Sequence, residues 1–312
     1  NRTNTHRLSS SAAIHRSTDS TWNQLYWGSV TKGEWNSVLS DRAFFEIRGG
    51  KIGYDWPNFS YAPDKPTYED VGNNEVSGGN RNWQHDRHRA QVLTSLTYFQ
   101  DGWGGDHNFK FGGEFFREIR RDHRGGLSRN PGGRNTGGYL FNDMFHILDN
   151  GVPSEIYLFE TPTTNDSRLW TYSFYASDSW AVNEHLTMNL GFRTDRYRSY
   201  LPEQKHGVGR IHCFTQVCQD GGKTFEARDV MTWDVVAPRI GVTYDVAGDG
   251  KTVLKANYGT YWWNPAGDLA NLVNANSPEW YRRHDWTDTN GDGLWQAGEE
   301  GAIVSQGGGS VN

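Results

Sequence analysis

The sequence predicts an all-β protein whose long antiparallel strands cross a membrane as part of a transmembrane β-barrel. Three observations support this fold class. The chain is rich in glycine and aromatic residues, apolar and polar residues alternate over long segments, and the connections between segments are alternately short and long. Alternation with a period of two is typical of strands with two different faces. Alternating connection lengths are typical of outer-membrane barrels.

The composition argues against other classes of protein. The 312 residues include 37 Gly, 14 Trp, 15 Tyr and 15 Phe, but hydrophobic residues make up only 35% of the chain. A soluble domain of this length carries more aliphatic residues for its core, and a disordered chain carries fewer aromatic ones. The net charge of −6 gives no electrostatic basis for binding nucleic acid, so we expect no such partner.

Alternating segments predict nine long strands. In "LTMNLGFRTDRY", for example, Leu186 and Leu190 oppose Arg193 and Asp195, and "DRAFFEIRGG", "NFKFGGEFFREI" and "VVAPRIGVTYDV" show the same pattern. A tilted strand needs ~9–11 residues to span a bilayer, and these segments have that length. In chain order, strands are predicted over residues 5–14, 22–38, 42–55, 85–100, 107–121, 167–182, 186–200, 232–246 and 252–263.

The connections indicate which side of the membrane each end of the barrel faces. Tight links occur at "SD" near Ser40, at "DGWGGD", at "NEH" and at "AGDGK", and we expect these to be periplasmic turns. The long connections are predicted to be extracellular loops. They cover residues 56–84, 122–166, 201–231 and 264–312. The second loop contains "FHILDNGVPSEIYLF", which predicts a hairpin turning at Asn150 and Gly151.

Two further features concern the barrel as a whole. Single-chain bacterial barrels have an even number of strands, so nine strands predict that the chain is a section of a larger barrel. Tryptophans near the predicted strand ends are expected to form aromatic girdles at the membrane surfaces. They are Trp22, Trp56, Trp83, Trp180, Trp233, Trp262 and Trp263.

Several segments resemble TonB-dependent outer-membrane receptors. Three of them, in the expected order, are "HNFKFGGEFFR", "YSFYASDSWAVNEHLTMNLGFRTDRY" and "VVAPRIGVTYDVAGDGKTVLKANYGTYW". A fourth, "GEWNSVLSDRAFFEIRGGKIGYDWP", is similar to the Oar-like branch of this family. Together these motifs cover most of residues 30–263. The resemblance implies that residues 1–312 are part of a receptor barrel of about 22 strands that surrounds a plug domain.

The resemblance also implies a function and a location. Such receptors bind scarce ligands outside the cell and import them with energy delivered by TonB. The expected location is therefore the cell outer membrane. The expected partners are outer-membrane lipid, the receptor's own plug domain, TonB and an unidentified external ligand. The 312 residues include neither a plug domain nor a TonB box, so transport is expected of a larger parent receptor.

Charged residues on the polar sides of the strands are predicted to face the barrel lumen. A charge that faced lipid would cost ~2–4 kcal/mol at the middle of the membrane. These residues are expected either to contact the plug or to pair with one another within the wall, and both interpretations remain open. They are Glu46, Arg48, Lys110, Glu114, Arg193, Asp195 and Arg239.

The segment "DTNGDGLWQAGE" has the spacing of an EF-hand calcium loop. It predicts a structural Ca²⁺ ion in an extracellular loop, with Gly293 allowing the sharp turn. The predicted ligands are Asp288, Asn290, Asp292, the backbone carbonyl of Leu294, Gln296 and Glu299. Paired EF-hand helices are not evident, although "SPEWYRRHDW" before the loop predicts one short helix. The alternative is a polar loop that matches the motif by chance.

The two cysteines, Cys213 and Cys218, predict a small disulfide loop in an oxidising compartment. Two alternatives remain. One is a pair of free thiols. The other is a metal site that includes His206 and His212, although the spacing matches no usual zinc pattern.

Sequence patterns give no indication of catalysis. Runs such as "HDRH" and "DHR" are typical of solvated strand ends and lack the spacing of a metal or catalytic site, so we expect no enzyme. The leading hypothesis is a segment of a ligand-importing receptor. One alternative is an outer-membrane protein that binds partners without transport. Another is a soluble secreted all-β protein that binds calcium and carbohydrate.

Overall fold

Strands make up most of the chain. The computed structural model describes residues 2–7, 15–124, 144–161, 163–206, 219, 221–264, 266–276 and 280–307. None of the helices in these residues is long and apolar enough to span a membrane. The prediction of an all-β protein is confirmed, because strands cover most of the described residues.

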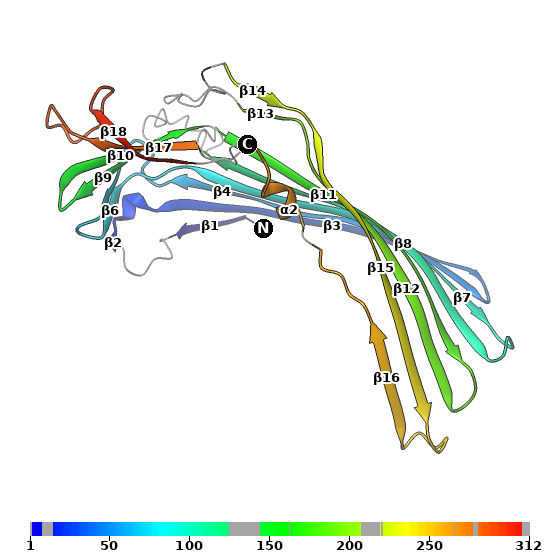
Figure 1. The fold of residues 1–312 in the computed structure, drawn as a ribbon. Coiled ribbons are helices and arrows are strands. Elements are labelled where there is room, and N and C mark those ends of the chain that lie inside the picture. Colours follow the sequence, from blue (N-terminus) through cyan, green and yellow to red (C-terminus); the bar gives the residue numbers. More distant parts are fainter. Residues whose placement is uncertain are drawn as a thin grey trace.

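Nine strands form one continuous antiparallel sheet, which curves along its length (Figure 1). Seven of them have 16–19 residues, and the two edge strands have 6 and 7. Each strand pairs with its neighbours in chain order through hairpins, as in a barrel wall. The sheet does not close on itself within the described residues. In spatial order the strands are β1 (Arg2–Arg7), β3 (Trp22–Ser40), β4 (Ala43–Ser60), β7 (Trp83–Gln100), β8 (Asp106–Arg124), β11 (Thr163–Ala181), β12 (Leu186–Leu201), β15 (Arg228–Asp245) and β16 (Val253–Gly259).

The two ends of this sheet differ in their connections. The turns after β3, β7, β11 and β15 are short and lie together at one end, at the lower right of Figure 1. The long connections lie at the other end. We call these the turn end and the loop end. Most strands reach further toward the loop end than the sequence predicted, so the loops expected over 56–84, 122–166 and 201–231 begin or end inside strands. Alternation of apolar and polar residues ends before the strands do, because the strand residues nearest the loop end carry mostly polar side chains.

The predicted loops are also more ordered than expected, because parts of them form a second sheet of seven strands (Figure 1). We call it the loop sheet. Its strands come from segments far apart in the sequence, including the region before β3. In spatial order they are β18 (Glu300–Gly307), β17 (Trp280–Trp286), β10 (Val152–Glu160), β9 (Met144–Asp149), β5 (Thr67–Asp70), β6 (Glu75–Gly78) and β2 (His15–Arg16).

Two local predictions can be compared with the loop sheet. The hairpin expected at Asn150 and Gly151 is confirmed, with φ angles of 52° and 81° at the turn. Positive φ at both residues suits a two-residue hairpin turn, which Asn-Gly favours. The short helix expected before the calcium-type loop is wrong, because residues 280–286 form β17 between β10 and β18. Tertiary pairing overrides the local helical tendency there.

Smaller elements complete the fold. A 3-10 turn, η1 (Thr18–Ser20), precedes β3. A two-stranded sheet of β13 (Gln204–His206) and β14 (Lys223–Phe225) lies between β12 and β15 in the sequence. The short helix α2 (Asp268–Asn271) follows β16 and contacts β11 and β12.

The two faces of the nine-stranded sheet have opposite chemistry. One, which we call the polar face, carries Glu46, Glu114 and Arg193. The other, the apolar face, leaves large side chains such as Phe111, Phe174 and Phe192 exposed by 40–46%. The polar face also holds a small core of Phe116, Leu169, Tyr197 and Val235 near the loop end. The loop sheet has its own core of Met144, Ile156, Leu158 and Trp286.

Candidate functional site on the polar face

The seven charged residues predicted to share a face all lie on the polar face, and ion pairs join most of them. Glu46 binds Arg48 at 2.6 Å and Lys110 at 3.6 Å. Further around the sheet, Arg193 spans β11 to bind Glu114 at 2.8 Å and also binds Asp195 at 2.8 Å. These contacts are pairs within the wall, one of the two interpretations left open by the sequence. Contact with a plug stays a prediction.

The turn-end half of the polar face is hollowed by a groove of about 500 Å³, lined in part by Lys110, Arg193 and Arg239. The Arg239 guanidinium lies 5.1 Å from the ring centre of Tyr261. Tyr175 lies across Gly112, because a Cβ atom there would be 2.3 Å from the tyrosine ring. Glycine thus lets a large side chain lie flat against the wall.

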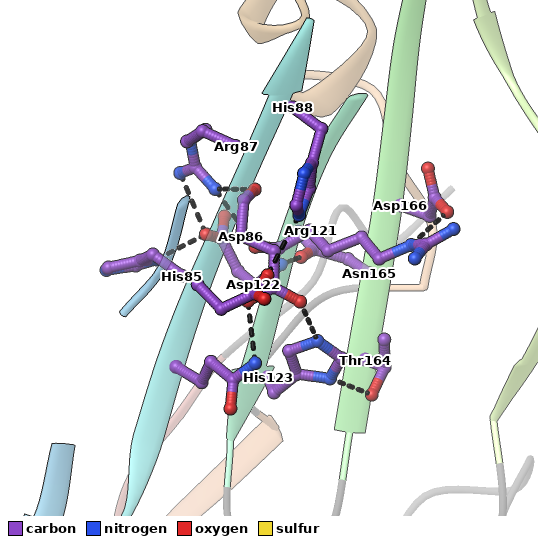
Figure 2. A network of polar contacts seen from close by, with 12 residues as sticks. His85, Asp86, Arg87, His88, Arg121, Asp122, His123, Thr164, Asn165 and Asp166 are labelled. Atoms are coloured by element: carbon purple, nitrogen blue, oxygen red, sulfur yellow. Dashed lines mark hydrogen bonds and ion pairs between the residues drawn. The ribbon is translucent and has the colours of Figure 1, made fainter. Parts of the chain in front are cut away.

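Near the loop end, Asp122 is the centre of a buried ion-pair network on the polar face. Its carboxylate binds His85, Arg87 at 2.9 Å and Arg120 at 3.0 Å. Figure 2 shows His85 and Arg87 converging on Asp122. Burial raises the pKa of Asp122, but the hydrogen bond from His85 and the charge of Arg87 outweigh it and hold that pKa below its usual range. Asp122 lies beyond the apolar stretch of β8, which we place in the membrane.

A second network occupies the opposite face of the same strands (Figure 2). Asp86 binds His123 at 3.0 Å. Asp166 binds Arg121 at 2.7 Å and Arg168 at 2.9 Å. The prediction that "HDRH" and "DHR" are solvated strand ends is wrong about solvation, because Asp86 and Asp122 are 93% and 97% buried at the loop end.

Residues 266–276, which we call the strap, cross the polar face at the loop end. Asp268 pairs with Arg120 of β8. Asn165 Nδ2 donates to Asn271 Oδ1 at 2.6 Å, and Asn276 Nδ2 donates to the Thr164 carbonyl at 2.7 Å. The strap therefore fixes part of the last long connection against the inner strands of the sheet.

A pocket of about 280 Å³ lies between the strap and the wall. Tyr54, Arg87, Arg89 and Glu118 line its wall side, and residues 266–268 line its strap side. Two buried polar atoms of this wall, Arg89 Nε and Glu118 Oε2, have no hydrogen-bond partner among the described residues. Buried polar atoms are normally satisfied, so a polar ligand is one explanation for this pair. This pocket was not predicted from the sequence. The signal available in the sequence was the spacing of Arg87 and Arg89, because two residues that are two positions apart on a strand point to the same face of the sheet.

The expected tryptophan girdles are wrong for four of the seven residues. Trp22, Trp56, Trp83 and Trp233 lie on the polar face, since each pairs with a residue of that face on the next strand. The rings of Trp22 and Trp56 lie 6.2 Å and 5.7 Å from that of Trp83. A position near a strand end does not determine which face of the sheet a side chain occupies. Side chains alternate between the two faces along a strand, so Trp56 shares the face of Arg48, from which it is an even number of residues away.

The remaining three tryptophans have different positions. Trp180 lies on the apolar face near the turn end, stacked 5.2 Å from His107. This location suits a girdle residue. Trp262 and Trp263 belong to the segment after β16 and are 54% and 79% exposed.

The calcium-type loop is held by its own backbone amides. Asp288 accepts hydrogen bonds from Gly291 and Gly293, each at 2.7 Å. Glu299 reaches across the loop and accepts from the backbone amides of Gln296 and Thr289, at 2.9 Å each. These amides, Gln296 first, lower the pKa of Glu299 to about 2, so its carboxylate is ionised.

The other predicted ligands of this loop lie close together. Asp292 accepts from the side-chain amides of Asn290 at 3.1 Å and Gln296 at 2.8 Å. Leu294 donates its amide to Asp292 at 2.8 Å. Within the described residues, no three His, Cys, Asp or Glu side chains are grouped so as to hold a metal ion.

The predicted disulfide between Cys213 and Cys218 lies outside the described residues, as does His212. His206, the other histidine of the alternative metal site, is 4% exposed and binds Glu160 at 2.9 Å through Nε2.

Comparisons with known proteins agree with this architecture. No curated protein matches the chain. Solved structures that are similar over part of their length include three crystal structures of receptors. The chain is 13% identical to the open form of the ferric-catecholate import receptor Fiu of E. coli K12, with a TM-score of 0.50, and the match covers 88% of this chain and 40% of Fiu. The closed form of Fiu gives 14% identity, a TM-score of 0.46, and coverage of 86% and 39%.

The third structure is the siderophore receptor PiuA of Acinetobacter baumannii, with 15% identity, a TM-score of 0.46, and coverage of 86% and 38%. The chain thus spans about two fifths of each of these receptors. The likeness to open Fiu concerns the fold alone. The profile of the outer membrane beta barrel domain matches residues 3–300. The location in the outer membrane is thereby confirmed, and the chain belongs to the outer membrane beta barrel domain family.

Proposed function

We propose that this chain forms part of the wall of an outer-membrane receptor that binds an external ligand and imports it with energy delivered by TonB. The soluble secreted alternative is wrong, because the family is an outer-membrane one. Membership of the Oar-like branch and the presence of a plug are parts of the same proposal. They rest on the sequence motifs.

The observation that carries this proposal is the pocket between the strap and the polar face. It lies at the loop end, where an external ligand enters. Arg89 and Glu118 of its wall pair with each other at 3.4 Å, and their remaining buried atoms, Arg89 Nε and Glu118 Oε2, have no partner among the described residues. Water-filled lumens are lined by polar residues, so the ion-paired face suits the inside of a receptor barrel. A surface adhesin has no need of a binding pocket on the inner side of its wall.

Uptake assays on cells that express the protein in their outer membrane test this function. Labelled ferric chelates, oligosaccharides and peptides are supplied in turn. We expect one class to be bound and imported, with import lost and binding kept when TonB is deleted. An Arg89→Gln variant is expected to weaken binding. Binding without import in cells that contain TonB contradicts the proposal and favours the adhesion alternative.

We also propose that the loop of residues 288–299 binds a structural Ca²⁺ ion. The carboxylates of Asp288, Asp292 and Glu299 belong to the same loop but are not gathered at one point, and the side-chain amides of Asn290 and Gln296 donate to Asp292. Rotation of either amide by half a turn would present its oxygen in place of its nitrogen. The oxygen set then matches the ligands that Ca²⁺ prefers, and the site would stabilise an external loop.

Terbium luminescence tests the calcium proposal, since Trp295 within the loop can transfer its excitation to a bound Tb³⁺ ion. We expect a signal that Ca²⁺ displaces, and we expect Glu299→Gln to weaken it at least tenfold because the bidentate ligand is lost. The matched control is Glu300→Gln, whose carboxylate binds the Trp295 indole and is not a predicted ligand. Equal signals from the two variants, or no signal from the unmodified protein, contradict the proposal.

A further inference from the structure

Arginines and aromatic residues form a compact patch on the apolar face of β8, β11 and β12. These strands are neighbours in the middle of the nine-stranded sheet (Figure 1). The register aligns nine positions in three rows. From the turn end to the loop end these are Phe115, Tyr172 and Arg196, then Arg117, Trp170 and Arg198, then Ile119, Arg168 and Tyr200. The standard spacings of a sheet make this arginine–aromatic patch roughly 10 by 13 Å.

The aromatic rings pack beside the arginines; Tyr172 is 45% exposed, whereas Tyr200 is buried at 8%. Phe115 lies 5.1 Å from Tyr172, and Trp170 lies 5.7 Å from Tyr200. The Arg198 guanidinium is 5.7 Å from the Trp170 ring centre and 4.8 Å from that of Tyr200. An arginine held over a ring face keeps its donor edge free to meet an anion.

The arginines of the patch outnumber the acids that reach them. None of the nine positions is acidic. Asp229 binds Arg198 at 2.7 Å and Asp234 lies 3.7 Å from Arg196. Asp166 binds Arg168 and is shared with Arg121 outside the patch. Arg117 has no ion pair within the described residues. Three carboxylates therefore serve four guanidinium groups and none reaches Arg117, and the Arg196 side chain remains 63% exposed.

The patch lies where the strands leave the hydrocarbon layer. On the same face, the next rows toward the turn end contain Phe111, Phe174 and Phe192, which are exposed and suited to lipid tails. Tryptophan and tyrosine concentrate at the height of lipid headgroups. The loop end is the extracellular end in this family's architecture, so the patch faces the outer leaflet.

We propose that the arginine–aromatic patch binds the phosphate groups of an outer-leaflet lipid, a phosphorylated glycolipid of the lipopolysaccharide type. Planar guanidinium groups bind phosphate through paired hydrogen bonds, which suits Arg117 and Arg198 on either side of Trp170. Trp170 between them and the exposed Tyr172 in the next row offer an apolar body and polar tips to the sugar portion of the headgroup. The unbalanced positive charge favours an anionic headgroup over a zwitterionic one.

The test uses the protein purified from outer membranes and placed in phosphatidylcholine vesicles. Binding is measured for lipopolysaccharide, for lipopolysaccharide stripped of its phosphates, and for inorganic phosphate as a competitor. The variant is Arg117→Gln with Arg198→Gln. The matched control is Lys51→Gln, which removes an exposed cation from the same row and face, two strands from Arg117.

We expect the unmodified protein to bind lipopolysaccharide and to bind the dephosphorylated form at least tenfold more weakly. Each arginine near a charged headgroup contributes about fivefold, so the double variant should lose about 25-fold. Lys51→Gln should stay within about twofold. The double variant Arg117→Lys with Arg198→Lys keeps the positive charge, so its loss of lipopolysaccharide binding should be intermediate. It replaces the glutamine variant in the test if that variant does not fold.

Three outcomes overturn the proposal. Equal binding of the two lipopolysaccharides shows that phosphate is not recognised. A loss in Lys51→Gln as large as in the double variant shows general electrostatic attraction rather than a site. Full competition by inorganic phosphate shows a free-anion site and not a lipid site.

Discussion

The nine-stranded sheet and the loop sheet are built in contrasting ways. In the nine-stranded sheet each strand pairs with its neighbours in chain order, and the apolar face leaves residues such as Phe111 and Phe192 exposed. In the loop sheet Glu155 of β10 pairs with Asp285 of β17, and Ile156 and His146 are fully buried. The first sheet needs lipid to cover its apolar face. The second resembles a small soluble domain with a core of its own.

This contrast implies that the two sheets respond to different perturbations. Loss of a buried side chain should unfold the loop sheet and leave the nine-stranded sheet intact. Changes on the wall should affect the nine-stranded sheet alone. Four experiments test this separation, from the largest expected effect to the smallest.

Ile156→Ala is expected to have the largest effect. Ile156 is fully buried in the core of the loop sheet, and removing such a side chain costs about 2–5 kcal/mol. Protease treatment of intact cells should then cleave the loops, while the heat-resistant electrophoretic mobility of the barrel stays unchanged. Val152→Ala in the same strand is the control, since Val152 is 63% exposed. Collapse of the whole barrel in Ile156→Ala would refute the separation.

Acidification should loosen the loop sheet through His146. Burial lowers the pKa of His146 to about 4 from an ordinary value of 6.5. The neutral ring accepts a hydrogen bond from the Trp295 amide at 3.1 Å. Because the unfolded state takes up the proton first, stability is complete above pH 6.5 and is lost as the pH falls toward 4, by at most about 3 kcal/mol.

The pH effect can be measured by tryptophan fluorescence of the protein in vesicles between pH 7 and 4. His146→Gln retains an acceptor and a donor but cannot titrate in this range, so its signal should change little. If the unmodified protein and this variant change alike over that interval, His146 is not responsible.

Gly112→Ala tests the wall. A Cβ atom at Gly112 would lie 2.3 Å from Tyr175 and 2.5 Å from the Thr94 carbonyl, so the tyrosine must move and the strand must shift. Such overpacking costs about 1–3 kcal/mol. The adjacent Gly113 is the control, because its nearest atoms would be 3.4 Å away. Urea unfolding in vesicles should give a lower midpoint for Gly112→Ala only, with protease resistance of the loops unchanged in both.

Lys251→Ala should have the smallest effect. Lys251 pairs with Asp249 at 2.9 Å in the turn between β15 and β16, but its side chain is 83% exposed. Water and salt screen such a pair, so its removal is expected to be without measurable effect on the melting temperature. A clear decrease would show that the turn end contributes to stability more than its exposure indicates.

Most of the nine-stranded sheet could be predicted from the sequence. Alternation identifies strands such as β12, where Leu186 and Leu190 oppose Arg193, and the Asn150-Gly151 pair identifies a hairpin. These signals are local, because antiparallel neighbours joined by short turns need no information about distant residues. The same alternation predicted that the seven charged residues share one face of the sheet.

The loop sheet and the pocket could not be predicted in the same way. β5 pairs with β9 in parallel at Tyr68 and His146, and no local pattern specifies such a partner. The strap contacts the wall through amides of Asn271 and Asn276, which look like ordinary loop residues in the sequence. Calcium binding by residues 288–299 and the disulfide of Cys213 and Cys218 stay predictions.

The order of strands in the loop sheet also has a consequence for biogenesis. β10 has β9 on one side and β17 on the other, so its second edge stays open until residues 280–286 pair with it. Closing so long a stretch of chain is entropically costly and slow compared with forming a hairpin. The wall can therefore assemble strand by strand, whereas completion of the loop sheet must wait for its last strands. An open β10 edge therefore marks an incompletely folded protein, which limited proteolysis is expected to distinguish from a finished one.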